Sequence, residues 1–257
     1  METDPHKWIA SIRSSHEQLD SLVRPLTPAD LLGPSYDDDW NVAQVLSHIG
    51  SQGEIFAKIL SANLEGRETP SREEFPPIWE AWNSRTPEEQ AADSLTVDAE
   101  LVQELEGLSD SQLDAMHLDL FGMELDAVAL ASMRLGEHSV HTWDVAVALD
   151  PDAQIAPDAV ELLVDTLPQV VGRAGKAQGS ALSVRVQTAA PDRDFQLTSN
   201  EDVQLSGWEG QEVDGTLQIP AEAFLRLVYG RLDADHTPPV NAEGVELDQL
   251  RAIFPGF

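Results

Sequence analysis

Residues 126–149 form the segment that most constrains what this chain can fold into. The sequence AVALASMRLGEHSVHTWDVAVAL is long enough for a helix of several turns, and Asp150-Pro151-Asp152 ends it. Its apolar side chains would cover almost the whole circumference of that helix, which predicts burial on several sides. A helix of this kind needs neighbours all round it. The segment therefore predicts a helical bundle in which it is an inner member.

Polar side chains interrupt this apolar helix along a single stripe. The stripe holds Arg134, Glu137, His138, His141 and Asp144. Burying a carboxylate, a guanidinium or an imidazole is costly unless the group is paired or binds a metal. Glu137 and His141 are four residues apart, so they project over adjacent turns and can hold one cation. Asp144 is placed to orient an imidazole.

A third ligand is available on an upstream helix, expected from the acidic run Asp37-Asp38-Asp39 to about residue 63. His48 lies at the edge of the apolar arc of that helix and can face the interior of the bundle. Two imidazoles and one carboxylate on facing helices leave a coordination position open, which is typical of catalytic zinc. His48, Glu137 and His141 are therefore the candidate metal ligands.

Structural interpretations of the same residues stay open at this point. Glu137 can be ion-paired with Arg134 or with a protonated histidine, and no metal is then needed. Arg134 is either a buried counter-ion for Glu137 or Asp144, or a group that contacts substrate. His138 points away from Glu137 and is expected not to be a ligand. The histidines expected at the surface or in loops are His6, His16, His117 and His236.

Two further pairs of residues allow a functional interpretation beside a structural one. Arg72 and Arg85 flank a segment rich in proline and tryptophan, where an arginine can bind a substrate carboxylate or be a solvated surface charge. Trp79 and Trp82 are three residues apart, so they either line the mouth of a pocket or pack as one face of a short helix.

The rest of the chain predicts an α+β multidomain protein. Helices are expected over residues 5–25, 78–85 and 86–108, which with the two above gives four principal antiparallel helices and a short one. After Pro151 the pattern changes to one helix, four alternating strands and two further helices. These elements are expected at 157–173, 182–188, 194–199, 202–207, 215–219, 220–229 and 246–254. We predict a helical bundle over 1–150 and a small α+β domain over 151–257.

Composition excludes several classes of function. The chain has 46 acidic and 15 basic residues, a net charge of −31, which argues against nucleic acid and anionic membranes as partners. It has no cysteine, so any sulfur chemistry needs an external thiol. Neither a signal sequence nor a long apolar span is found, which predicts a cytoplasmic protein. Dinucleotide, P-loop and serine-hydrolase motifs are absent.

Four stretches together resemble the mycothiol-dependent maleylpyruvate isomerase family. They are WNVAQVLSHIG, FPPIWEAWNSRTPEEQAADSL, MRLGEHSVHTWDVAVAL and the tail PAEAFLRLVYGRLDADHTP followed by LRAIFPGF. The resemblance implies a DinB-like four-helix bundle that binds a divalent metal, usually zinc, and a C-terminal domain like the sterol-carrier-protein domains that helps to close the active site. By position, the ligands of the family fall on His48, Glu137 and His141. An arginine that is important in the isomerase falls on Arg72 or Arg85.

The resemblance also implies a chemistry. The metal binds mycothiol or another low-molecular-weight thiol and lowers its pKa, and the thiolate attacks an electrophile. In the isomerase, addition to the cis double bond of maleylpyruvate, rotation and elimination give fumarylpyruvate. Our leading hypothesis is a metal-dependent isomerase or thiol transferase with Asp144 behind a ligand and Arg134 near the substrate. Its partners are the thiol and a small molecule, and it is a monomer or homodimer. The alternative is a non-catalytic metal- or small-ligand-binding or sensor protein on the same fold.

Overall fold

The computed structural model describes residues 1–37 and 39–256 in two compact units. One unit spans Glu2–Gln154, and the other runs from Ile155 onward and includes Met1. The first is helical and the second combines helices with a sheet, which confirms the expected α+β class with a helical N-terminal domain. Asp38, part of the expected acidic run, lies outside the described residues.

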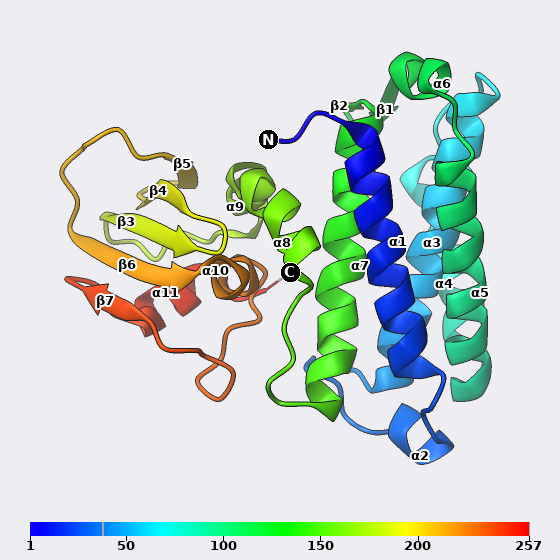
Figure 1. Cartoon of the computed structure of the whole chain (residues 1–257), viewed down its shortest axis with the longest axis horizontal. Helices are drawn as coiled ribbons and strands as arrows, with labels where there is room; N and C mark the ends of the chain where they lie inside the picture. The colour runs from blue at the N-terminus through cyan, green and yellow to red at the C-terminus, as the bar shows by residue number, and fades with distance from the viewer. Residues whose placement is uncertain (38, 257) are drawn as a thin grey trace. The chain divides into compact units, whose positions relative to one another are not determined.

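Four long helices build the first unit (Figure 1). They are α1 (Pro5–Val23), α3 (Val42–Leu64), α5 (Pro87–Glu106) and α7 (Ala127–Leu149). Each packs against two of the others, so that α1 lies between α5 and α7, and α3 also lies between α5 and α7. The helix expected over residues 126–149 is α7, and most of its side chains, Trp143 among them, are buried.

Helix starts follow local capping chemistry. Thr86 caps α5 by accepting from the Glu89 backbone N–H, and Pro87 occupies the first turn, as the sequence predicts. The start of α3 differs from the prediction. Its cap is Asn41, whose side chain and that of Gln44 form a reciprocal capping box, rather than the acidic run before it.

The four helices are not all antiparallel, which corrects the prediction. Helices α3 and α5 run in the same direction. Near their starts, Val45 of α3 and Ala91 of α5 belong to one core cluster, and further along both helices Gly53 lies beside Val97. The connection between them makes this possible. It includes α4 (Pro76–Asn83), which packs on α3 and brings the chain back before α5 begins.

Short elements complete the first unit. They are α2 (Pro28–Leu31), the 3-10 helix η1 (Arg72–Glu74), α6 (Asp110–Ala115), and a hairpin of β1 (Leu118–Leu120) and β2 (Met123–Leu125). None of these was expected from the sequence. Each is too short to show a hydrophobic period, which explains why a pattern search does not find it.

The second unit is a five-stranded sheet with helices. Its strands are β3 (Leu182–Ala189), β4 (Arg193–Ser199), β5 (Val203–Gly207), β6 (Gly215–Pro220) and β7 (Asn241–Glu243), in the order β5-β4-β3-β6-β7. Only the β3–β6 pair is parallel among these described strands. Its helices are α8 (Pro157–Leu163), the 3-10 helix η2 (Val164–Thr166), α9 (Leu167–Ala174), α10 (Ala221–Val228) and α11 (Leu247–Ile253).

The single helix expected over 157–173 is broken into α8, η2 and α9. Pro168 lies in the first turn of α9. Proline has no backbone N–H and its ring collides with the carbonyl one turn earlier, so a continuous helix cannot pass through it. Among residues 1–37 and 39–256, no helix is long and apolar enough to cross a membrane.

Candidate metal centre

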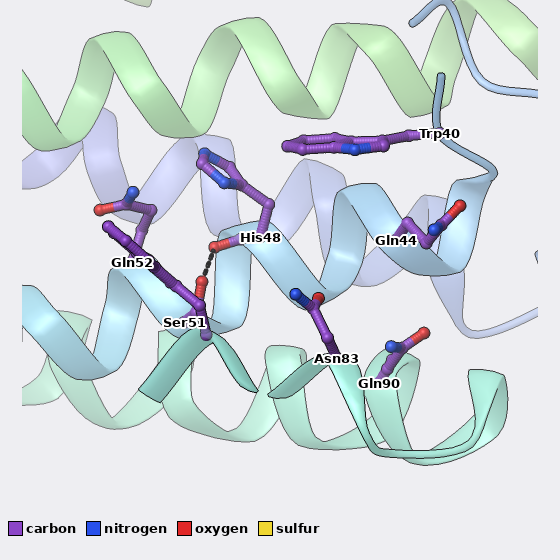
Figure 2. Close-up of a pocket in the computed structure, with 8 residues that line it drawn as sticks. Trp40, Gln44, His48, Ser51, Gln52, Asn83 and Gln90 are labelled. Atoms are coloured by element: carbon purple, nitrogen blue, oxygen red, sulfur yellow. Dashed lines mark hydrogen bonds between the residues drawn. The ribbon is translucent and has the colours of Figure 1, made fainter. Parts of the chain in front are cut away.

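His48 reaches the site from α3. The two turns between the Asn41 cap and His48 carry the buried side chains of Val42, Val45 and Leu46, which anchor the helix in the core. His48 itself is partly buried, and its ring lies 5.2 Å from that of Trp40, measured between ring centroids. Figure 2 shows the imidazole directed from α3 towards the neighbouring helix, with the Trp40 indole beside it.

Glu137 and His141 reach the same place from α7. The Glu137 Oε2 atom lies 3.5 Å from His48 Nε2 and 3.8 Å from His141 Nε2. One ligand atom from each of the three residues can be chosen so that all lie within 4.8 Å of one another. The structure thus brings together groups from two helices, since His48 and Glu137 are 89 residues apart in the sequence.

Asp144 fixes the direction of the His141 ring. Its Oδ2 atom lies 2.9 Å from His141 Nδ1, and the carboxylate is fully buried. An ionised carboxylate only accepts hydrogen bonds, so Nδ1 carries the hydrogen and Nε2 keeps its lone pair. Nε2 is the ring nitrogen nearer to Glu137, so its lone pair is available to a cation held by both residues. A carboxylate that holds a ligand histidine in this way is common at metal sites.

Electrostatics favour the protonation states of His48 and Glu137 that bind a cation. Burial lowers the pKa of His48, which favours its neutral form. Burial opposes ionisation of Glu137, but the hydrogen bond with His48 and the charges of His141 and Arg134 outweigh it and lower the pKa of Glu137 to about 2. Two imidazoles and one carboxylate fit a divalent metal with an open position, and zinc suits this donor set.

A cavity of about 570 Å³ opens beside His48 in the helical unit. It is lined by Trp40, Gln44, His48, Ser51, Gln52, Trp79, Asn83 and Gln90. The two tryptophans of α4 have different environments. Trp79 lines this cavity, whereas Trp82 is fully buried against Gly50 of α3. The position of the cavity gives a small molecule access to the histidine.

A second polar cluster lies in the core of the bundle and was not expected from the sequence. Asp98 on α5 is fully buried and contacts Arg134, His138 and His16. The distances from its carboxylate oxygens are 2.6 Å to Arg134 Nη2, 2.8 Å to His138 Nε2 and 2.7 Å to His16 Nδ1. The prediction that His16 lies free at the surface is therefore wrong, because its ring is paired with an interior carboxylate.

Arg134 is buried in the core of the bundle. Its side chain is 1% exposed, and its ion pair is with Asp98 rather than with Glu137 or Asp144. Arg134 acts on Glu137 and His48 through its charge, which lowers the pKa of both groups. His138 is also turned away from the candidate ligands, towards Asp98 and the Ser15 hydroxyl.

The two arginines considered for a substrate carboxylate also have other partners. The Arg72 guanidinium lies 4.4 Å from the centre of the Phe121 ring. That of Arg85 lies 3.6 Å from the Trp82 ring and 3.4 Å from the Asp93 carboxylate. Neither lines the cavity beside His48 in the described residues of the helical unit.

The fold and the site define a class: a helical bundle with a candidate three-ligand metal site, joined to a small α+β unit. Residues 12–146, more than half of the chain, match the family described as mycothiol maleylpyruvate isomerase N-terminal domain. The chain belongs to this family, which confirms the resemblance found in its sequence.

Solved structures show the same fold over nearly the whole chain. The crystal structure of the mycothiol-dependent maleylpyruvate isomerase has a TM-score of 0.70 and 15% identity, with 95% of each chain covered. A histidine-to-alanine mutant of the isomerase has the same TM-score and coverage, with 14% identity. No curated protein sequence matches the chain. At this identity the structures establish the fold, and the activity has to be argued from the site.

Proposed function

We propose that this protein is a metal-dependent enzyme that uses a low-molecular-weight thiol, mycothiol or a similar compound, as the nucleophile towards a small electrophile. The reaction is either isomerisation of that electrophile or transfer of the thiol to it. The observation that carries the proposal is the convergence of His48, Glu137 and His141, with Asp144 behind His141, in a chain of the isomerase family.

Each of the named residues has a distinct task in this proposal. His48, Glu137 and His141 would hold a divalent metal, with zinc as the proposed ion. Asp144 holds His141 in the tautomer that leaves Nε2 free to bind. A metal of this kind lowers the pKa of a bound thiol, so that the thiolate is present at neutral pH. The Arg134–Asp98 ion pair links α7 to α5.

The composition supports an external nucleophile. The chain has no cysteine, so it contains no thiol of its own to attack an electrophile. The cavity beside His48 has room for both a thiol and a small substrate, since ligand pockets of this kind span about 300–1,000 Å³. The thiolate has to form next to the electrophile, and His48 is the candidate ligand that lines this cavity.

Metal analysis of the purified protein tests the proposal. We expect one divalent metal per chain, and we expect His141→Ala and His48→Ala to lose it together with thiol transfer. His117→Ala is the matched control, because that imidazole is 75% exposed and is paired with Glu124 far from the site. It should keep the metal.

Two results would contradict the proposal. Full metal retention by His141→Ala would show that the ligand assignment is wrong. A wild-type protein that binds metal but neither binds a thiol nor lowers its pKa would leave the metal in a non-catalytic role. The thiolate is followed directly by its ultraviolet absorbance, so this result does not depend on knowing the substrate.

A further inference from the structure

The cavity beside His48 has an unusual lining for a site in such an acidic protein. Its eight described lining residues include two tryptophans, four carboxamides, one serine and one histidine, and no aspartate, glutamate, lysine or arginine. The chain as a whole carries a net charge of −31. A ligand in this cavity therefore meets hydrogen-bonding groups and aromatic faces, with no fixed charge among the lining side chains to pair with.

Two of the four carboxamides of this lining, Gln44 and Asn83, are held so that they present N–H groups, whereas the NH2 group of Gln90 donates to the Trp82 carbonyl. Gln44 uses its Oε1 atom to accept from the Asn41 backbone N–H, 2.9 Å away. Asn83 uses its Oδ1 atom to accept from the Ser47 hydroxyl, 3.0 Å away. In both side chains the oxygen is engaged and the NH2 group is left as the donor. Gln52 follows His48 by one helical turn and lines the same cavity (Figure 2).

Arginines that might have neutralised an anionic ligand are engaged elsewhere in the helical unit. Arg72 stacks on Phe121, Arg85 stacks on Trp82, and Arg134 is buried in its ion pair with Asp98. A carboxylate brought into the cavity would lose hydration without gaining an ionic partner, which is unfavourable. Amide N–H donors and tryptophan faces instead suit uncharged carbonyl, ester or amide groups.

The charges at the candidate centre lead to the same conclusion. A divalent ion is neutralised by the Glu137 carboxylate and one thiolate together, so the loaded centre would supply no net positive charge for a second anion. The net charge of −31 on the chain also repels a dianion that approaches it. A dicarboxylate is therefore disfavoured both in the cavity and on its way to it.

We infer that the cavity beside His48 selects an uncharged ligand with carbonyl or amide groups over a dicarboxylate of the same size. This inference rests on the proposed function for the role of the ligand as substrate, but the binding preference is a property of the cavity itself. Tryptophan and carboxamide side chains, mainly Trp40, Gln44, Gln52 and Asn83, provide the selectivity.

Succinamide and succinate are matched probes, because they share one carbon skeleton, differ in charge and do not react with thiols. Their affinities are measured by ligand-observed NMR titration of the full chain, with and without 2-mercaptoethanol to occupy an open metal position. We expect succinamide to bind at least about tenfold more tightly than succinate. Equal or tighter binding of succinate, or no binding of succinamide, overturns the inference.

A charge placed in the lining shows whether the probes bind in this cavity. Gln52→Lys adds a cation beside His48 and should reverse the preference in favour of succinate. Gln52→Met, which is uncharged and similar in length, should not reverse it. An unchanged preference in Gln52→Lys overturns the inference. Metal content and thiol pKa are measured separately, so failure of the proposed function is recognised independently of these affinities.

Discussion

Asp98 contacts three charged or titratable side chains in the interior of the bundle, although its own side chain is fully buried. Burial opposes its ionisation, but the charges of His138 and Arg134 and the hydrogen bonds from His138 and His16 hold the pKa of its carboxyl well below the usual range. Burial lowers the pKa of His138, and its Nε2–H donates to Asp98. Ser15 completes the contact at Nδ1.

Asp98→Asn is expected to destabilise the protein strongly. The substitution leaves the Arg134 guanidinium buried without its counter-ion, and the Nε and Nη1 atoms of Arg134 already have no hydrogen-bond partner in the described structure. Breaking a buried pair in this way costs about 3–5 kcal/mol. Urea denaturation measures the change in free energy of unfolding.

Asp93→Asn is the matched control on the same helix. The Asp93 side chain is 49% exposed and lies 3.4 Å from Arg85, so its loss should cost less than about 1 kcal/mol. Similar losses for the two variants would show that the Asp98 cluster does not support the core as the geometry indicates.

Acid should remove the contribution of Asp98. The folded carboxyl has a pKa below the value of about 3.9 for an unfolded aspartate. Its contribution is therefore present above about pH 4, and it is lost as the pH falls through the folded pKa, because the unfolded chain takes up the proton first. The stability gap between wild type and Asp98→Asn should narrow from about pH 5 downwards.

Urea titrations of both proteins at a series of pH values measure this gap. The three groups that face Asp98 are His16, His138 and Arg134, and all three are present in both proteins. A gap that widens on acidification would contradict the assigned direction of the shift.

The contact between α3 and α4 shows how one glycine positions an element of the cavity. A Cβ atom added at Gly50 would lie 2.2 Å from the ring of Trp82, so the indole packs directly against the α3 backbone. Asn83 follows Trp82 in the chain and bonds to Ser47 of α3. Close packing at Gly50 therefore places one wall of the cavity beside His48.

Gly50→Ala should separate the two helices. We expect a loss of about 1–3 kcal/mol from overpacking, together with weaker binding of any ligand that uses Asn83. Gly172→Ala is the control, because Gly172 also lies inside a helix but a Cβ atom there meets nothing within 4 Å. It should gain up to about 1 kcal/mol from helix propensity. Urea denaturation compares both variants, and equal effects would contradict the packing argument.

Long elements and the candidate ligands could be predicted from the sequence, for physical reasons. In α7 the apolar period is sustained for many turns, and the polar stripe is conspicuous because every other face is apolar. The spacing of Glu137 and His141 fixes their common face in any helix. Predicting His48 as a ligand required one further assumption, that its helix packs against α7. The two helices are in contact in the structure.

The buried role of Asp98 and the direction of α5 could not be predicted in this way. Asp98 is one of 46 acidic residues, and nothing in the surrounding sequence SLTVDAEL distinguishes it from a solvated one. Its burial follows from the packing of α5 against α1, which carries His16, and from its contacts with Arg134 and His138 of α7. Such tertiary information is not present in local periodicity, so the sequence offered Glu137 and Asp144 as carboxylate partners of Arg134 and did not indicate Asp98.

The whole molecule has about three times as many acidic residues as basic ones, 46 against 15. With a net charge of −31 over 257 residues, like charges repel one another in the compact state more than in the expanded chain. Many acidic groups have local partners, for example Asp194 with Arg185 and Asp165 with Arg193, but 15 basic residues cannot pair with 46 acidic ones. The remaining repulsion is long-ranged, and its strength depends on the ionic strength of the solvent.

Salt should therefore stabilise this protein. The Debye length falls from about 30 Å at 0.01 M to about 10 Å at 0.1 M salt, so most of the repulsion between distant carboxylates is screened within that interval. We expect the midpoint of urea denaturation to rise steeply over this range and more slowly above it. Sodium and potassium chloride should act alike if screening is the cause, whereas a marked difference between them would indicate bound cations. A midpoint that does not change between 0.01 and 0.1 M, about a tenfold change in ionic strength, would mean that the surface charges are already compensated in the folded state.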